Sequence, residues 1–284
     1  MQRRVLAALT TVLLASACTT GTTTEDVPAP QPTLAPTASP SLRAAPARVP
    51  PPLWVVGASP LPIASDGFGK RLPTPAVLRN RRLPTTDVLP PPADGRFRST
   101  IGPVTPAIGS RMGETYRAGC PVRISSLRYV RLVFRGFDGR AHTGELVVHV
   151  TAAPKAVRAF RKLFELRFPI EQMSLPTTAS LRAKPTGDGN DTAGFVCRPA
   201  RGQTRFSAHA YGVAIDVNPF HNPLVRGDLV LPELASAYRD RAWVRPGMLL
   251  AGSPEVRAFT REGFTWGGNF SRPKDYQHFS LSGD

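Results

Sequence analysis

The stretch RISSLRYVRLVFRGFDGRAHTGELVVHV, residues 123–150, decides the fold. Apolar side chains alternate along its first half, and β-branched residues are frequent in its second half, which is typical of two strands. The glycines of GFDGR favour a turn between them. Residues 154–166, PKAVRAFRKLFEL, repeat apolar side chains at helical spacing and predict a helix with a proline in its first turn. A hairpin followed by a helix predicts an α+β fold, a small antiparallel sheet with flanking helices.

The remaining elements are expected over residues 107–284, a length that suits one domain. Residues 212–217 predict a buried strand, and residues 275–281 predict a closing strand. Residues 233–240 (ELASAYRD) and 253–264 (SPEVRAFTREGF) predict helices. The region therefore mixes strands and helices around one core.

Residues 19–106 have a different composition and contain most of the 31 prolines. Proline-rich chain with few aromatic side chains cannot bury enough apolar surface to order itself, so this segment predicts a disordered, extended stalk. A chain that begins near Thr105 is accordingly expected to fold and to keep its activity. Only the apolar residues 53–56 (LWVV) are candidates for docking on the domain.

Residues 1–18, MQRRVLAALTTVLLASAC, predict an export signal, because two arginines precede a short apolar run and small residues precede Cys18. The segment resembles a bacterial lipoprotein signal, which implies lipidation of Cys18. The protein would then be a membrane-anchored lipoprotein that faces the cell wall; the alternative is ordinary secretion.

The chain is strongly basic, with 36 Lys+Arg against 20 Asp+Glu and a formal charge of +16. Such a charge usually indicates an acidic polymer as a partner. Export makes nucleic acid a poor partner, so anionic wall polymers or a membrane surface are expected instead. Solubility alone is the alternative explanation of the charge.

If Cys18 carries lipid, two of the three cysteines remain, Cys120 and Cys197. An even pair in an exported chain predicts a disulfide. Two buried, reduced thiols are the alternative.

Two short segments carry the chemistry: SAHAYGVAID, residues 207–216, and DYQHF, residues 275–279. His209, Asp216 and His278 are residue types that bind zinc, and a catalytic zinc takes three protein ligands with one position left open. Gly212 would let the backbone pass close to such a site. Spacing alone makes this a weak indication.

The pattern SxHxxGxAxD followed by DxxHF resembles the zinc D,D-/L,D-peptidase family of VanY-type carboxypeptidases and phage endolysins, in particular a secreted branch. Further similarity lies in GCPV (119–122), RFPI (167–170), FVCRP (195–199) and GFTWGGNF (263–270). Asn269, Phe270 and Val213 depart from the residues that are common in that branch, which concerns substrate fit rather than the metal site.

The resemblance implies one zinc ion bound by His209, Asp216 and His278. It also implies that Asp275 is the general base, that Arg198 stabilises an oxyanion, and that Ser207 supports the first ligand by a hydrogen bond. The implied activity is hydrolysis of peptidoglycan stem-peptide bonds, by a carboxypeptidase or an endopeptidase. A non-catalytic relative that binds peptidoglycan or acts as a cell-wall scaffold is the alternative.

Overall fold

The computed structural model describes residues 54–200 and 202–283. The predicted signal peptide, Cys18 and residues 19–53 of the predicted stalk lie outside the described residues. Contacts divide the chain into Met1–Val49 and Pro50–Asp284, and the following description concerns the second unit. Within its described part, no helix combines the length and the apolar character that a membrane crossing requires.

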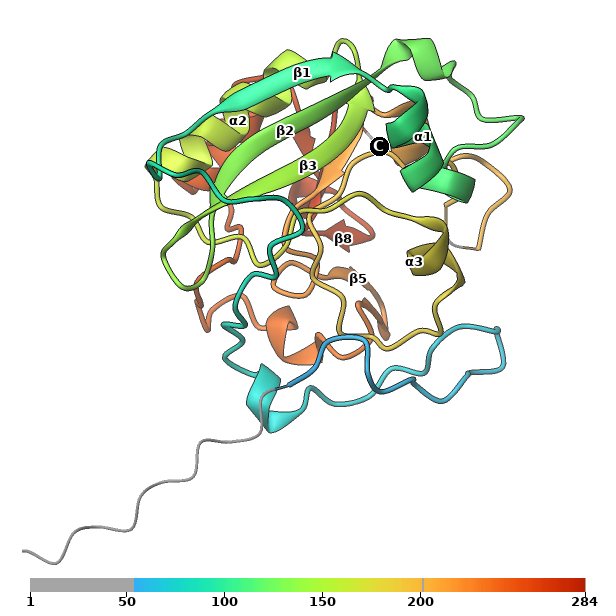
Figure 1. Ribbon diagram of the computed structural model, residues 1–284. Coiled ribbons are helices and arrows are strands. Elements are labelled where there is room, and N and C mark those ends of the chain that lie inside the picture. Colours follow the sequence, from blue (N-terminus) through green and yellow to red (C-terminus); the bar gives the residue numbers. More distant parts are fainter. Residues whose placement is uncertain (1–53, 201, 284) are drawn as a thin grey trace, which may run out of the picture. The chain divides into compact units, whose positions relative to one another are not determined.

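The predicted hairpin is confirmed as β2 (Leu127–Arg135) and β3 (Ala141–His149), which pair antiparallel over their full lengths. A third strand, β1 (Ser99–Pro103), pairs with the other edge of β2 (Figure 1). β1 comes from the segment that the sequence assigned to the stalk. The proline-rich composition around β1 gave no indication of this five-residue strand, which is stabilised by pairing with β2.

The predicted helix is confirmed as α2 (Ala153–Glu165), which packs against β2 and against α4 (Pro254–Thr260). Apolar side chains from one face of the hairpin, among them Val130, Leu132 and Phe134, are buried with those of α2 in the largest core cluster. The other face contributes Leu127 and Val147 to a second cluster, which includes Met112 of α1 (Pro106–Met112). Both faces of the hairpin are therefore covered.

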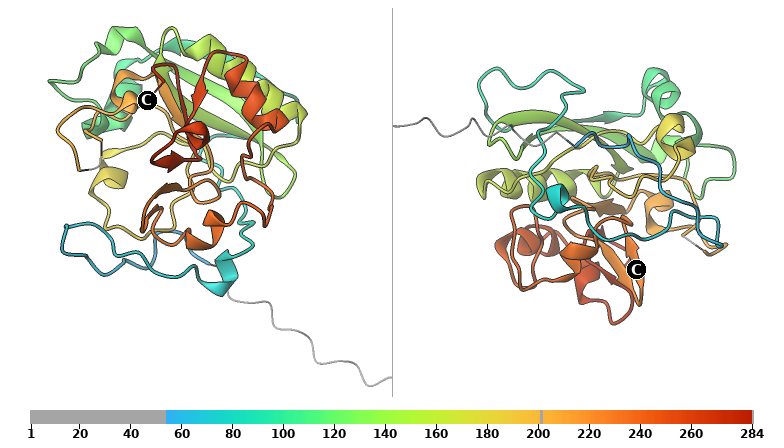
Figure 2. Two further views of the ribbon diagram at one scale, coloured as in Figure 1. Left: turned by 180° about the vertical axis from the view of Figure 1, so that it is seen from behind. Right: turned by 90° about the horizontal axis from the view of Figure 1, so that it is seen from below.

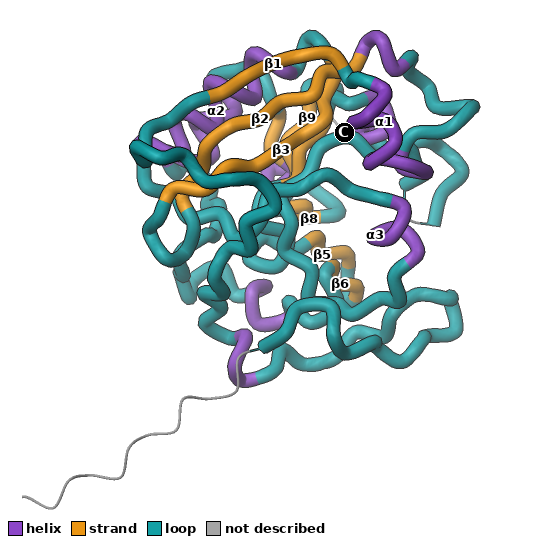
Figure 3. The backbone as a smooth tube through the Cα atoms, in the orientation of Figure 1, coloured by secondary structure: helices purple, strands orange, loops and turns teal. Residues whose placement is uncertain are grey.

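The short helix α3 (Thr178–Arg182) contacts the turn that follows α1, where the Glu114 backbone donates to the Thr178 hydroxyl. The remaining strands form two small antiparallel sheets. The order of the first sheet is β4 (Ala214–Asp216), β9 (His278–Ser280) and β7 (Thr265–Trp266). The order of the second is β6 (Leu229–Leu231), β5 (Leu224–Arg226) and β8 (Lys274–Asp275). Short strands joined by long loops dominate this half of the unit (Figure 3). The α+β class is thus confirmed.

Two predicted elements differ in detail. The single closing strand expected over residues 275–281 is divided into β8 and β9, which belong to different sheets. Residues 233–240 form only a 3-10 helix, Ser236–Arg239, which ends at the extended residue Asp240.

Residues 54–106 belong to the same compact unit as the rest, so the structure places the domain boundary well before residue 106. The Trp54 indole donates to Asp188 at 2.8 Å, and the Arg81 guanidinium is buried against Glu171. Leu61 and Leu78 lie in a third core cluster with Phe220 and Tyr238. The segment has little secondary structure of its own (Figure 2). These widely spaced side chains fix it to the rest of the unit.

Candidate metal centre

The two small sheets and a 3-10 helix bring the predicted ligands together. Asp216 on β4 lies directly opposite His278 on β9, so both side chains leave the same face of that sheet. His209 lies on the 3-10 helix Ala208–Tyr211, which leads into β4. Gly212 closes this helix with a φ of 69°, and a Cβ there would lie 2.7 Å from the backbone nitrogen of His149. Glycine is therefore required at this turn for both reasons.

One atom from each of His209, Asp216 and His278 lies within 4.8 Å of the others. The Oδ1 atom of Asp216 is 3.3 Å from Nε2 of His209 and 3.1 Å from Nδ1 of His278. The two imidazole centroids are 5.1 Å apart. Both histidines are buried, and the Asp216 side chain retains 18% exposure. These three groups thus converge on one point at the edge of solvent.

The arrangement fits a zinc ion. Zinc binds histidine nitrogen and carboxylate oxygen at about 2.0–2.2 Å, so neighbouring ligands of a tetrahedral site lie about 3.4 Å apart. The 3.1 Å and 3.3 Å separations around Asp216 Oδ1 are close to that value. Two imidazoles with one carboxylate are also a common donor set for catalytic zinc.

Hydrogen bonds from outside the group of three orient His209 and Asp216. Nδ1 of His209 lies 2.7 Å from the carbonyl oxygen of Gly194, which can only accept, so Nδ1 carries the proton and Nε2 faces Asp216. Gln277 donates its side-chain amide to Oδ2 of Asp216 at 3.2 Å. The backbone role of Gly194 leaves no trace in a sequence, whereas Gln277 lies inside the DYQHF segment.

The hydrogen bond expected from Ser207 is not present. The Ser207 hydroxyl oxygen is buried and has no hydrogen-bond partner within the described ranges. The Gly194 carbonyl supports His209 in its place. The resemblance implied a bond that the local geometry does not make.

The electrostatics of the two carboxylates differ. Burial raises the pKa of Asp216, but the charges of His209 and His278 and their hydrogen bonds outweigh it and hold this pKa well below its usual range. Burial raises the pKa of Asp275 to about 7, and the negative charge of Asp216 adds to that rise. The Oδ1 atom of Asp275 is buried and has no hydrogen-bond partner among the described residues. One carboxylate is therefore stabilised as an anion, and the other is poised to take a proton near neutral pH.

The three groups and Asp275 line a cleft of about 540 Å³. One wall comes from residues 198–208 and contains Arg198, whose exposed guanidinium donates weakly to the carbonyl of Pro199 at 3.3 Å. The positive charge of Arg198 lowers the pKa of Asp275, so the two residues face the same space. Phe270, one of the departures noted in the sequence, also lines the cleft. The β5–β6 hairpin completes it and was not anticipated from the sequence.

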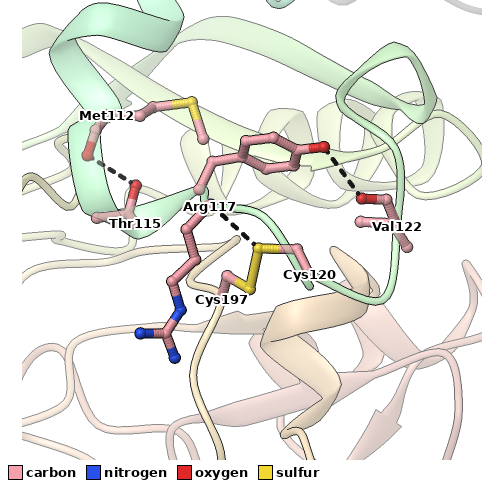
Figure 4. The surroundings of a disulfide bond; sticks show 7 residues. Met112, Thr115, Arg117, Cys120, Val122 and Cys197 are labelled. Carbon is pink, nitrogen blue, oxygen red and sulfur yellow. Dashed lines mark hydrogen bonds between the residues drawn. A yellow bond between two sulfur atoms is a disulfide. The ribbon is translucent and has the colours of Figure 1, made fainter.

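The predicted disulfide between Cys120 and Cys197 is present, with Cα atoms 5.8 Å apart (Figure 4). Cys197 is buried and directly precedes Arg198. The backbone nitrogen of Cys197 donates to the carbonyl of Thr115, and that of Arg117 donates to the Cys120 sulfur. The disulfide therefore fixes the start of the cleft wall that carries Arg198.

Residues 201–281 match the family described as D-alanyl-D-alanine carboxypeptidase. This segment contains His209, Asp216, Asp275 and His278, and the match confirms the resemblance to zinc peptidases predicted from the two motifs. No curated protein and no solved structure matches the chain at a significant level.

Proposed function

We propose that this chain, whose residues 201–281 match the zinc peptidase family of D-alanyl-D-alanine carboxypeptidases, hydrolyses bonds in peptidoglycan stem peptides. The observation that carries the proposal is the convergence of His209, Asp216 and His278 beside a buried carboxylate of raised pKa in one cleft. An exported location at the cell wall, with Cys18 as the anchor, is part of the same proposal, since this substrate lies outside the membrane.

His209, Asp216 and His278 would hold the zinc ion. Zinc bound there would polarise the scissile carbonyl and lower the pKa of a water molecule from about 15.7 to roughly 7. The Gly194 carbonyl and the Gln277 amide keep two of the ligands oriented without any rearrangement. The protein thus supplies a rigid three-ligand site that opens on a cleft.

Asp275 would act as the general base. Its buried Oδ1 has no other hydrogen-bond partner in the described part of the chain, so it can accept a proton from the attacking water. A pKa of about 7 also lets the resulting acid return the proton to the leaving amine at neutral pH. The guanidinium of Arg198, on the facing wall, would stabilise the negative charge that develops on the carbonyl oxygen.

Digestion of purified muropeptides, followed by mass spectrometry, tests the proposal and identifies the bond. The zinc-loaded wild type is expected to release amino acids or peptides from stem peptides. Asp275→Asn keeps the side-chain size and the three ligands but cannot accept the proton. It is expected to retain zinc and to cleave about 10²–10⁴ times more slowly.

A wild type that binds zinc and peptidoglycan but cleaves no stem peptide would instead establish the non-catalytic binding or scaffold function. A variant Asp275→Asn that cleaves as fast as the wild type would exclude Asp275 as the base while leaving the peptidase activity in place.

A further inference from the structure

One face of the second small sheet forms a wall of the cleft. In this sheet Leu224 lies opposite both Leu231 and Asp275, and Arg226 lies opposite Leu229. Directly opposed residues share a face, as do residues two apart on one strand. The residues on this face all line the cleft: Leu224, Arg226, Leu229, Leu231 and Asp275. The alternate residues Val225, Val230 and Lys274 do not, and Val230 is buried in the third core cluster.

The register therefore fixes Arg226 relative to the proposed base. Arg226 is two residues from Leu224, the partner of Asp275, so the two backbone positions are separated by about 7 Å along the strand. If this antiparallel register is continued by one residue, Arg226 comes next to Pro273. Arg272 directly precedes this proline and also lines the cleft. A substrate whose reacting carbonyl lies next to Asp275 would place its neighbouring residues beside these guanidiniums.

The described lining of the cleft is also rich in arginine. The arginines among its lining residues are Arg198, Arg205, Arg226 and Arg272. Among the described residues that line it, the acidic ones are Asp216 and Asp275, both at the candidate metal centre. Arg226 and Arg272 are exposed, and neither forms an ion pair with any residue that the structure describes. Like charges in one concave site repel each other and focus a positive potential, which attracts an anion.

We propose that Arg226, with Arg272 beside it, binds a carboxylate of the substrate one or two residues from the scissile bond, so that the substrate is an acidic peptide. This specificity rests on the proposed function. A planar guanidinium matches a carboxylate through two parallel hydrogen bonds, which a neutral amide cannot reproduce with the same strength. The leucines of the same face contact the apolar parts of the peptide.

The test uses the full chain and peptides of the stem type, in which each acidic side chain or free carboxyl group is replaced singly by its amide. Binding to the metal-free wild type is measured by calorimetry, and kcat/KM is measured with zinc. Amidation at one position is expected to lower both the binding affinity and kcat/KM by about tenfold or more. The ratio of the values for the acidic peptide to those for the amidated peptide should approach one in Arg226→Gln. Arg226→Lys should restore part of the preference for the acidic peptide. Arg226→Glu should prefer the amidated peptide.

Arg261→Gln is the matched control, because Arg261 is an exposed arginine outside the cleft lining, and it should keep the wild-type ratio. Equal binding of acidic and amidated peptides by the wild type would overturn the inference, as would an unchanged ratio in both Arg226→Gln and Arg226→Glu. A wild type that prefers the acidic peptide but cleaves none would refute the proposed function alone. Cleavage without any preference would refute the specificity alone.

Discussion

The guanidinium of Arg81 donates two hydrogen bonds to the carboxylate of Glu171, at 2.7 Å and 2.5 Å, with the Arg81 side chain fully buried. A third bond runs from Arg81 to the Asp188 carbonyl, and the guanidinium lies 4.4 Å from the centre of the Phe220 ring. The backbone oxygen of Arg81 also accepts from the buried His221. One arginine thus connects the proline-rich segment to the interior of the domain.

Arg81→Ala is expected to lower the free energy of unfolding by about 3–5 kcal/mol, because it leaves the buried carboxylate of Glu171 without its counter-charge. The neighbouring Arg82 is exposed, so Arg82→Ala is a matched control that should change this quantity by at most about 0.5 kcal/mol. Urea unfolding of both variants measures the difference. Equal stability of the two would show that the buried ion pair contributes nothing.

A chain that begins at residue 54 is expected to fold, whereas one that begins at Thr105 is expected to be unfolded or aggregated. The shorter chain lacks β1, Arg81 and the Trp54–Asp188 hydrogen bond, and it exposes the apolar surface under Leu61 and Leu78. This outcome reverses the expectation drawn from composition. Circular dichroism and size-exclusion chromatography of both chains decide the matter, and a folded, active chain from Thr105 would restore the original boundary.

Zinc binding is expected to depend on the three converging side chains. The wild type should bind one zinc ion, and His209→Ala or His278→Ala should release it, because the two remaining ligands bind zinc weakly. His149→Ala is the control, since that histidine hydrogen-bonds to Thr151 and lies outside the cleft lining. Elemental analysis after gel filtration gives the metal content. Full zinc in both ligand variants would rule out this site.

The stability of the metal-free protein is expected to fall with rising pH because of Asp275. Its folded pKa of about 7 lies above the value of about 3.9 for an unfolded aspartate. The contribution of this group to stability is therefore complete below about pH 4 and is lost as the pH rises to about 7, by at most about 1.4 kcal/mol per pH unit. Asp275→Asn should remove that slope. Urea unfolding at about pH 5 and about pH 8 tests it, and identical slopes in both proteins would contradict it.

The metal centre and the hairpin were open to prediction because each depends on local information. Alternation and a glycine-containing turn are sufficient for β2 and β3, and the family resemblance of two short motifs indicated His209, Asp216 and His278. The orientation of His209 was not predictable, since it depends on a backbone carbonyl fifteen positions away in sequence.

The proline-rich segment shows where composition misleads. Averaged over residues 19–106, it lacks the apolar content of a core, yet single side chains such as Trp54, Leu78 and Arg81 find partners more than eighty residues away. Arg226 was missed for a related reason. Its position beside Asp275 follows from the pairing of β5 with β8, which no pattern within residues 224–231 reveals.

Because the Cys120–Cys197 bond fixes one wall of the cleft, the shape of the cleft depends on the redox conditions under which the chain folds. In a reducing cytosol the segment that begins at Arg198 would lose its covalent tether, while backbone hydrogen bonds such as that from Ser207 to the Arg198 carbonyl would remain. In an oxidising environment the same segment is locked before any substrate arrives. If the chain is exported as proposed above, this wall of the cleft would become covalently fixed only once the two cysteines are oxidised outside the cytosol.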